Sequence, residues 1–149
     1  ALNAELAPGA ELWLDGGHNS AAGRALALTF RRWSDSDPLL RPLFLVVGMM
    51  NAKDVSDFLA PFANLVQAVI GVRIPGEANA LPAAEICRCA RAIGIPAQAA
   101  SDPKNALMRV SRHSSKNLLP RVLICGSLYL AGSVLALESK AVKAPGELS

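Results

Sequence analysis

Cysteine and aromatic residues are scarce in this sequence of 149 residues. The cysteines are Cys87, Cys89 and Cys125, and aromatic side chains make up 5% of the chain. An odd number of cysteines without a C-x-x-C pair favours buried thiols in a reducing compartment over disulfides, and it disfavours a zinc site. We therefore predict that the residues of this chain alone hold no metal ion.

Long apolar segments and dense charge of one sign are also missing. No apolar run approaches the roughly 18 residues that span a membrane, and the N-terminus lacks the pattern of a signal peptide. The net charge is +3, the basic residues are scattered, and there is a single tyrosine. Nucleic-acid binding is therefore disfavoured. We expect a cytoplasmic protein without a membrane or nucleic-acid partner.

Two common phosphate-binding signatures are absent as well. The chain contains no G-x-x-x-x-G-K-[ST] segment, which is the P-loop, and Gly16-Gly17 followed by Gly23 does not have the spacing of a dinucleotide fingerprint. The composition, with 52% hydrophobic and 18% charged residues, is nevertheless that of a globular protein with a real core. A nucleotide site, if present, must be built differently.

Strand-like and helix-like segments alternate along the chain. The apolar runs predict strands at 12–14, 43–48, 65–74, 96–99 and 121–125, and helical spacing predicts helices at 21–33, 55–62, 81–93, 103–110 and 128–137. Such alternation is typical of an α/β fold with a mostly parallel sheet and helices on both faces. We expect one domain over 1–137 and a frayed tail over 138–149. Because residues 1–10 look like an irregular lead-in, we also expect the chain to be cut from a longer one.

The stretch from Leu12 to Gly23 organises the chain. A short apolar strand runs into the turn Gly16-Gly17, and Asn19 or Ser20 can cap the helix that follows. Such a junction presents backbone N–H groups and the positive end of a helix dipole, which suit an anion. Asp15 and His18 lie at the carboxyl end of the strand, where open α/β sheets bind ligands. The alternative is that they are only a cap and a surface residue.

Two further strand ends carry polar residues. Asn51, Lys53 and Asp54 follow the second strand, and Ser127 follows the last. Strand ends of this kind share one edge of a parallel sheet, which makes that edge the predicted functional face. Lys53 and Asp54 could equally be a solvated cap and an ion partner at a helix start, and Ser127 could be a helix cap.

The same loops resemble a known family. Leu14-Asp15-Gly16-Gly17-His18-Asn19 resembles the signature of folylpolyglutamate synthases and dihydrofolate synthases, members of the Mur ligase superfamily. Val47-Gly48-Met49 with Lys53-Asp54 resembles their second loop, and the segment from Gly126 to Gly132 their last strand–helix junction. The resemblance implies a Rossmann-like C-terminal domain, without the larger N-terminal ATPase domain that carries the P-loop. Ser20 and Ala52 depart from the family pattern, which has a proline and an acid there.

The resemblance also implies an activity. In that family ATP phosphorylates a pterin-bearing carboxylate, and the amine of L-glutamate attacks the acyl phosphate, releasing ADP and phosphate. Carried over, Asp15 would bond the ATP ribose and His18 would approach the phosphates, with Asn19 as a further nucleotide contact. Lys53, Asp54 and Ser127 would contact substrate. Magnesium would be held mainly by the N-terminal domain, so this chain alone would contain no catalytic residues and be inactive; the superfamily leans towards monomers.

Two other functions stay open. One is the C-terminal domain of a Mur peptidoglycan ligase, although such enzymes usually show Asp-Tyr-Ala-His in place of Asp15-Gly16-Gly17-His18. The other is a free-standing module that binds a nucleotide or phosphate. Tight ATP binding by the isolated chain would favour the module, because a half-site should bind weakly.

Overall fold

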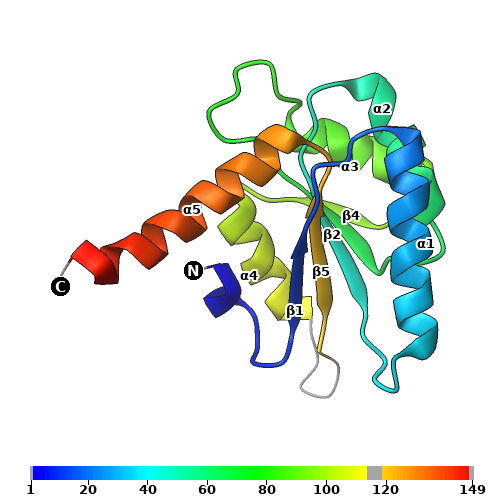
Figure 1. Cartoon of the computed structure of the whole chain (residues 1–149). Helices are drawn as coiled ribbons and strands as arrows, with labels where there is room; N and C mark the ends of the chain where they lie inside the picture. The colour runs from blue at the N-terminus through cyan, green and yellow to red at the C-terminus, as the bar shows by residue number, and fades with distance from the viewer. Residues whose placement is uncertain (1, 114–118, 148–149) are drawn as a thin grey trace.

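A five-stranded, fully parallel sheet forms the centre of the computed structural model, which describes residues 2–113 and 119–147 (Figure 1). The strand order is β1-β5-β2-β3-β4. The strands are β1 (Glu11–Leu14), β2 (Leu43–Val47), β3 (Ala68–Gly71), β4 (Ala97–Ala99) and β5 (Arg121–Cys125). The last strand along the chain therefore lies between the first and the second.

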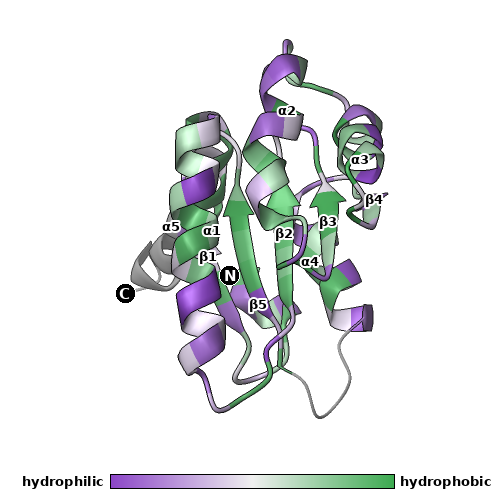
Figure 2. Cartoon of the chain, turned by 90° about the vertical axis from the view of Figure 1, so that its right-hand side faces the viewer, coloured by the Kyte–Doolittle hydropathy of each residue, from purple (hydrophilic) through white to green (hydrophobic). Residues whose placement is uncertain are grey.

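Helices cover both faces of the sheet. One face carries α1 (Ser20–Ser36), α2 (Ala52–Leu59), the 3-10 turn η2 (Ala60–Phe62) and α3 (Ala83–Ala92), and Figure 2 looks onto this face. The other carries the 3-10 turn η1 (Leu2–Glu5), α4 (Pro103–His113) and α5 (Leu128–Glu147). The prediction of an α/β fold with a parallel sheet and helices on both faces is confirmed.

The side chains of β2 show how the two layers of core are filled. Leu45 and Val47 belong to the cluster under α1, α2 and α3, whereas Phe44 and Val46 belong to the cluster under α4 and α5. All four are at most 2% exposed. Successive side chains of a strand point to opposite faces, so a strand covered on both sides must be apolar throughout.

Helices α1 and α2 pack against each other at very short range. A Cβ on Gly23 would lie 2.3 Å from the carbonyl oxygen of Phe58. Only glycine allows the two backbones to approach this closely. Since α1 and α2 each follow a loop of the carboxyl edge, their contact also fixes those loops relative to each other.

The opposite, amino edge of the sheet is held by an ion network. Arg121 in β5 is 7% exposed and donates hydrogen bonds to the carboxylates of Glu11 and Asp37, the latter at 3.1 Å. Arg41 lies 3.2 Å from Asp37, and the Arg121 guanidinium lies 5.6 Å from the ring centroid of Trp33. The hydrogen bond from Arg121 lowers the pKa of Glu11, against the smaller opposing effect of burial. The network links β1, β5 and the chain after α1.

Several boundaries differ from those predicted. The strand expected over 65–74 is limited to β3, Ala68–Gly71, and the helix expected to end near 137 continues to Glu147. The expected loop over 34–42 begins later, because α1 runs to Ser36. The helix expected over 103–110 continues to His113, which ends α4 and begins the connection to the strand at 121–125. Residues 114–118 of that connection are outside the described part of the chain.

The lead-in is less irregular than expected. Residues Leu2–Glu5 form a 3-10 turn, and Leu2 and Leu6 are buried against the face covered by α4 and α5. The backbone N–H of Leu2 donates to the Glu138 carboxylate at 2.7 Å. Among the described residues, no helix combines the length and apolar character that crossing a membrane requires.

Candidate functional site

The strand order brings three loops together at the carboxyl edge of the sheet. Because β5 lies between β1 and β2, the loops that follow these strands are neighbours. The chain leaves β1 and β2 towards the face of α1 and α2, but leaves β5 towards the opposite face with α5. Neighbouring strands whose connections diverge in this way leave a crevice between their loops, the usual ligand position in open α/β sheets.

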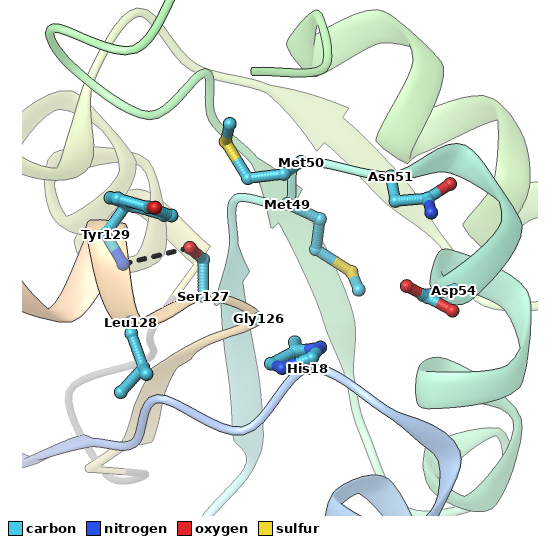
Figure 3. A pocket seen from close by; sticks show the side chains of 9 residues that line it. All are labelled: His18, Met49, Met50, Asn51, Asp54, Gly126, Ser127, Leu128 and Tyr129. Carbon is cyan, nitrogen blue, oxygen red and sulfur yellow. Dashed lines mark hydrogen bonds between the residues drawn. The ribbon is translucent and has the colours of Figure 1, made fainter. Parts of the chain in front are cut away.

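A pocket of about 250 Å³ occupies this crevice (Figure 3). One wall comes from the loop before α1, one from the start of α2 and one from the start of α5. The lining residues are His18, Met49, Met50, Asn51, Asp54, Gly126, Ser127, Leu128 and Tyr129. The predicted residues His18, Asp54 and Ser127 thus come from three different loops and meet at one pocket.

The loop after β1 is a turn closed by Asp15. The Asp15 side-chain oxygen Oδ1 accepts the backbone N–H of Gly17 at 2.7 Å, and the Gly17 carbonyl accepts the N–H of Gly126 at 3.1 Å. An aspartate that bonds the backbone two residues on is a common way to stabilise a turn. Asn19 then caps α1, since its side chain accepts the N–H of Ala22 at 2.9 Å. His18, between these fixed points, is exposed.

The loop after β2 brings one carboxylate to the pocket. Asn51 caps α2 by accepting the N–H of Lys53 at 3.0 Å, and Asp54 in the first helical turn is half-buried and lines the pocket. Lys53 is exposed and is not among the lining residues. Within 2–113 and 119–147, neither Lys53 nor Asp54 forms an ion pair.

The loop after β5 presents the N-terminus of α5. Ser127 is 4% exposed, and its hydroxyl accepts the N–H of Tyr129 at 3.0 Å, so it caps the helix as the alternative interpretation expected. Gly126 has φ +107°, and a Cβ there would lie 2.7 Å from the Gly48 carbonyl oxygen. Leu128 and Tyr129 beside it are strongly exposed, at 72% and 59%. The pocket therefore has a tight polar floor and an open apolar rim.

The electrostatic character of the pocket is mixed. The first N–H groups and the dipole of α5 favour an anion, whereas the Asp54 carboxylate favours a cationic group. Below the floor, burial and, to a smaller extent, the charge of Asp15 raise the pKa of the Cys125 thiol, so this cysteine is a poor nucleophile. No cluster of three or more metal-ligating side chains occurs among the described residues.

The structure separates the predicted residues into two groups. His18, Asp54 and Ser127 line the pocket, while Asp15, Asn19 and Lys53 do not. Met49, Met50 and Tyr129 also line it but were not singled out as site residues. Their sequence signals were their position directly after two predicted strands and, for Met49 and Tyr129, their place within the segments that resemble the family's loops.

The parallel sheet and the pocket at its switch point define the class of the protein: an α/β domain with a ligand crevice at the carboxyl ends of its strands. A family model described as "Dihydrofolate synthetase, C-terminal domain" matches residues 3–137. The chain therefore belongs to this family of dihydrofolate synthetase C-terminal domains, which confirms the resemblance inferred from its motifs. No curated protein matches the chain.

Solved structures with the same fold are folate ligases. The chain has a TM-score of 0.69 and 22% identity to the bifunctional folylpolyglutamate synthase/dihydrofolate synthase of Yersinia pestis complexed with AMPPNP and Mn ion, covering 93% of this chain and 32% of that one. For Mycobacterium tuberculosis folylpolyglutamate synthase, complexed with ADP and AMPPCP, the TM-score is 0.68 and the identity 22%, covering 85% of this chain and 29% of that one. For E. coli FolC in complex with ADP, the TM-score is 0.68 and the identity 18%, covering 93% of this chain and 32% of that one. The chain thus spans about a third of the length of these neighbours.

Proposed function

We propose that this chain is the C-terminal domain of an ATP-dependent folate–glutamate ligase. The parent enzyme would join L-glutamate to dihydropteroate, to a reduced folate, or to both, with ADP and phosphate as products. The observation that carries the proposal is the meeting of His18, Asp54 and Ser127 at one pocket of a domain that belongs to the dihydrofolate synthetase family. The presence of ATP analogues in the Mycobacterium and Yersinia neighbours supports a nucleotide as one ligand.

In the proposed reaction, the substrate carboxylate attacks the γ-phosphorus of ATP, and ADP leaves. The glutamate amine then attacks the acyl carbon, the carbon–oxygen bond to phosphate breaks, and the amine loses a proton. Negative charge on the transferring phosphoryl group must be stabilised, and the reactants must be held in line. His18 reaches the pocket from the nucleotide-facing loop, and its imidazole would approach the phosphates. Asp15, through its second carboxylate oxygen, and Asn19 would contribute on the nucleotide side.

The other two walls suit the amino-acid substrate. The N-terminus of α5 beside Ser127 favours a carboxylate, and Asp54 favours an ammonium group; Lys53, exposed at the start of α2, would reach a second carboxylate. A bifunctional folylpolyglutamate synthase/dihydrofolate synthase of the same fold was solved with Mn, AMPPNP and L-glutamate bound, which supports glutamate as the amino acid. Apolar Met50 and Tyr129 at the rim would exclude water around these contacts.

Magnesium fits this pocket only as an ion whose ligands come from several sources, of which this domain is one. Asp54 is the one carboxylate that lines the pocket, and the described residues hold no cluster of three or more metal-ligating groups. Most ligands would therefore come from the nucleotide phosphates and the N-terminal ATPase domain. When bound, the ion would neutralise phosphate charge during transfer. We further propose a cytoplasmic, monomeric enzyme.

The first test is the release of ADP by the complete polypeptide that carries this chain. It would be measured with ATP, L-glutamate and either dihydropteroate or a reduced folate, next to the same reactions with the 149-residue chain. Glutamate-dependent release by the complete polypeptide alone would support the ligase, and the preferred acceptor would identify its branch. Absence of release with both acceptors would refute the proposal and favour a peptidoglycan-type ligase or a nucleotide-binding module.

A further inference from the structure

A turn that is held on both sides lies directly before His18. Asp15 extends the ladder of β1 and β5 by one bond, since its N–H donates to the Ile124 carbonyl at 3.0 Å. Its side chain then accepts the Gly17 N–H at 2.7 Å, while the Gly17 carbonyl accepts from Gly126. Both sides of the Gly17 residue are therefore held, one by Asp15 and one by the loop of β5.

The turn also has little space for side chains at its two glycines. A Cβ on Gly17 would lie 2.7 Å from the Cβ of Ala22 and 2.9 Å from Oδ1 of Asp15. A Cβ on Gly16 would lie 2.3 Å from Cδ2 of Leu128. The turn thus lies between the first turn of α1 and the first residue of α5, and a side chain at Gly17 would meet both Ala22 and Asp15.

His18, in contrast, forms no hydrogen bond or ion pair with another described residue and is exposed. Its position follows from its backbone, which the Gly17–Gly126 bond fixes before it and the Asn19 cap fixes after it. Asp15 does not line the pocket. Its carboxylate acts on the turn, and the turn fixes the backbone from which the imidazole projects.

We propose that Asp15 is a positioning residue, whose Oδ1 holds the Gly16–Gly17 turn so that His18 is aimed into the pocket. This inference rests on the proposed role of His18 at the phosphates. It adds to the ribose contact proposed for the second carboxylate oxygen of Asp15, which needs no His18 and acts on nucleotide affinity. An asparagine offers the same Oδ1 acceptor as Asp15, whereas an alanine offers none.

One experiment examines the turn without any reaction. Amide hydrogen exchange at Gly17 would be measured by NMR in the 149-residue chain for the wild type, Asp15→Asn and Asp15→Ala. Faster exchange in Asp15→Ala alone supports the proposal. Equal exchange in all three chains overturns it. Asp57→Ala, which removes an exposed carboxylate from α2, serves as the matched control.

A second experiment couples Asp15 to His18 in the complete polypeptide, through a double-mutant cycle on ADP release. We expect Asp15→Ala to lower kcat by about 10- to 100-fold, and Asp15→Asn to keep kcat near the wild-type value. In a His18→Ala background, Asp15→Ala should lower kcat no further, because the imidazole that the turn positions is gone. A loss of kcat of equal size in both backgrounds, or a rise in the KM for ATP as the only effect, would overturn positioning and leave the ribose contact as the role of Asp15. Failure of the wild type to release ADP would refute the proposed function instead, while the exchange experiment still decides the turn.

Discussion

At the scale of single residues, His18 and Asp54 differ from the side chains that hold the backbone around them. Asp15 and Asn19 bond main-chain N–H groups from outside the pocket, whereas Asn51 and Ser127 cap helices and also line it. His18 and Asp54 line the pocket without structural partners among the described residues. Mutations in the two groups should therefore be separable by what they damage.

For His18 we expect a loss of turnover without a loss of stability. In the complete polypeptide, His18→Ala should lower kcat by about 10²- to 10³-fold, as removal of a group that stabilises transition-state charge commonly does. The unfolding free energy of the chain should change by no more than about 0.5 kcal/mol, since the side chain is exposed. Asn19→Ala is the contrast, because loss of its cap on α1 should cost about 1 kcal/mol. Steady-state kinetics and urea unfolding check both statements; a destabilised His18→Ala with normal turnover would contradict them.

The Glu11–Arg121 pair makes the folding stability of the chain depend on pH. The pKa of Glu11 is lower in the folded chain than in the unfolded chain, because Arg121 donates to its carboxylate. Its contribution is therefore complete above the ordinary glutamate pKa of about 4.3, and it disappears as the pH falls through the lower folded value. Thermal melts between about pH 6 and pH 3 should show a smaller acid-induced decrease in Tm for Glu11→Gln than for the wild type. Glu77→Gln, a carboxylate with no ion pair in the described ranges, should retain the wild-type decrease.

At the scale of elements, the packing of α1 against α2 depends on how closely their backbones approach each other. Gly23 in α1 touches the main chain of α2, so the two helices that border the site meet without side chains between them. A Cβ on Gly132 in α5, in contrast, would have no described neighbour within 4 Å. The same substitution should therefore have opposite effects in these two helices.

Gly23→Ala should destabilise the chain by about 1–3 kcal/mol, because a backbone carbonyl cannot move aside without shifting α1. Gly132→Ala should stabilise it by about 0.5–1 kcal/mol, since alanine is the better helix former and space is available. Urea unfolding of both variants gives the two values directly. Equal effects of the same sign would show that the contact between α1 and α2 is looser than the structure describes.

Local sequence patterns predicted the elements well where burial and pattern agree. The prediction of β5 is confirmed residue for residue, because its five residues are buried, the last four are apolar, and Pro120 and Gly126 bound the strand. The strand at 65–74 was predicted too long, because Val72 and Ile74 are buried after the strand has ended. The end of α5 was missed because residues beyond 137 carry no apolar period, although alanine, lysine and glutamate are good helix formers.

The site could be predicted only in part, for a topological reason. Sequence places the polar residues at strand ends, but it does not say that β5 enters between β1 and β2, and this placement makes one pocket from His18, Asp54 and Ser127. Tyr129 was missed because its role depends on where α5 starts relative to the other two loops. The bond from the Gly17 N–H to Asp15 could not be predicted from the sequence, since an aspartate before two glycines can face either its own backbone or a ligand.

At the scale of the whole molecule, the domain presents an open half of a site. Its floor is closed by Gly126 and Ser127, but Leu128 and Tyr129 at the rim are exposed. Under the proposed function, a second surface would be needed to surround a nucleotide, and the structural neighbours are about three times as long as this chain.

We therefore expect the 149-residue chain to bind AMPPNP only weakly, with a dissociation constant on the order of 1 mM, and to release no ADP. Isothermal titration calorimetry and a coupled ADP assay would measure the two quantities. Micromolar binding would contradict the half-site and favour a free-standing nucleotide-binding module.

The position of β5 also has a consequence for the order in which the molecule is made. Strands β2, β3 and β4 are consecutive both along the chain and in the sheet, so they can pair as soon as they leave the ribosome. The first strand, β1, pairs only with β5 within the described sheet, and must wait until residue 125 has been synthesised, about 110 residues after its own end, which takes roughly 5–20 s at ribosomal rates. During that interval the loop that carries His18 lacks its contact with the loop after β5. Completion of the binding edge is therefore among the last events of folding, and a nascent chain that stops before β5 cannot assemble the ligand pocket, because one of its walls has not yet been made.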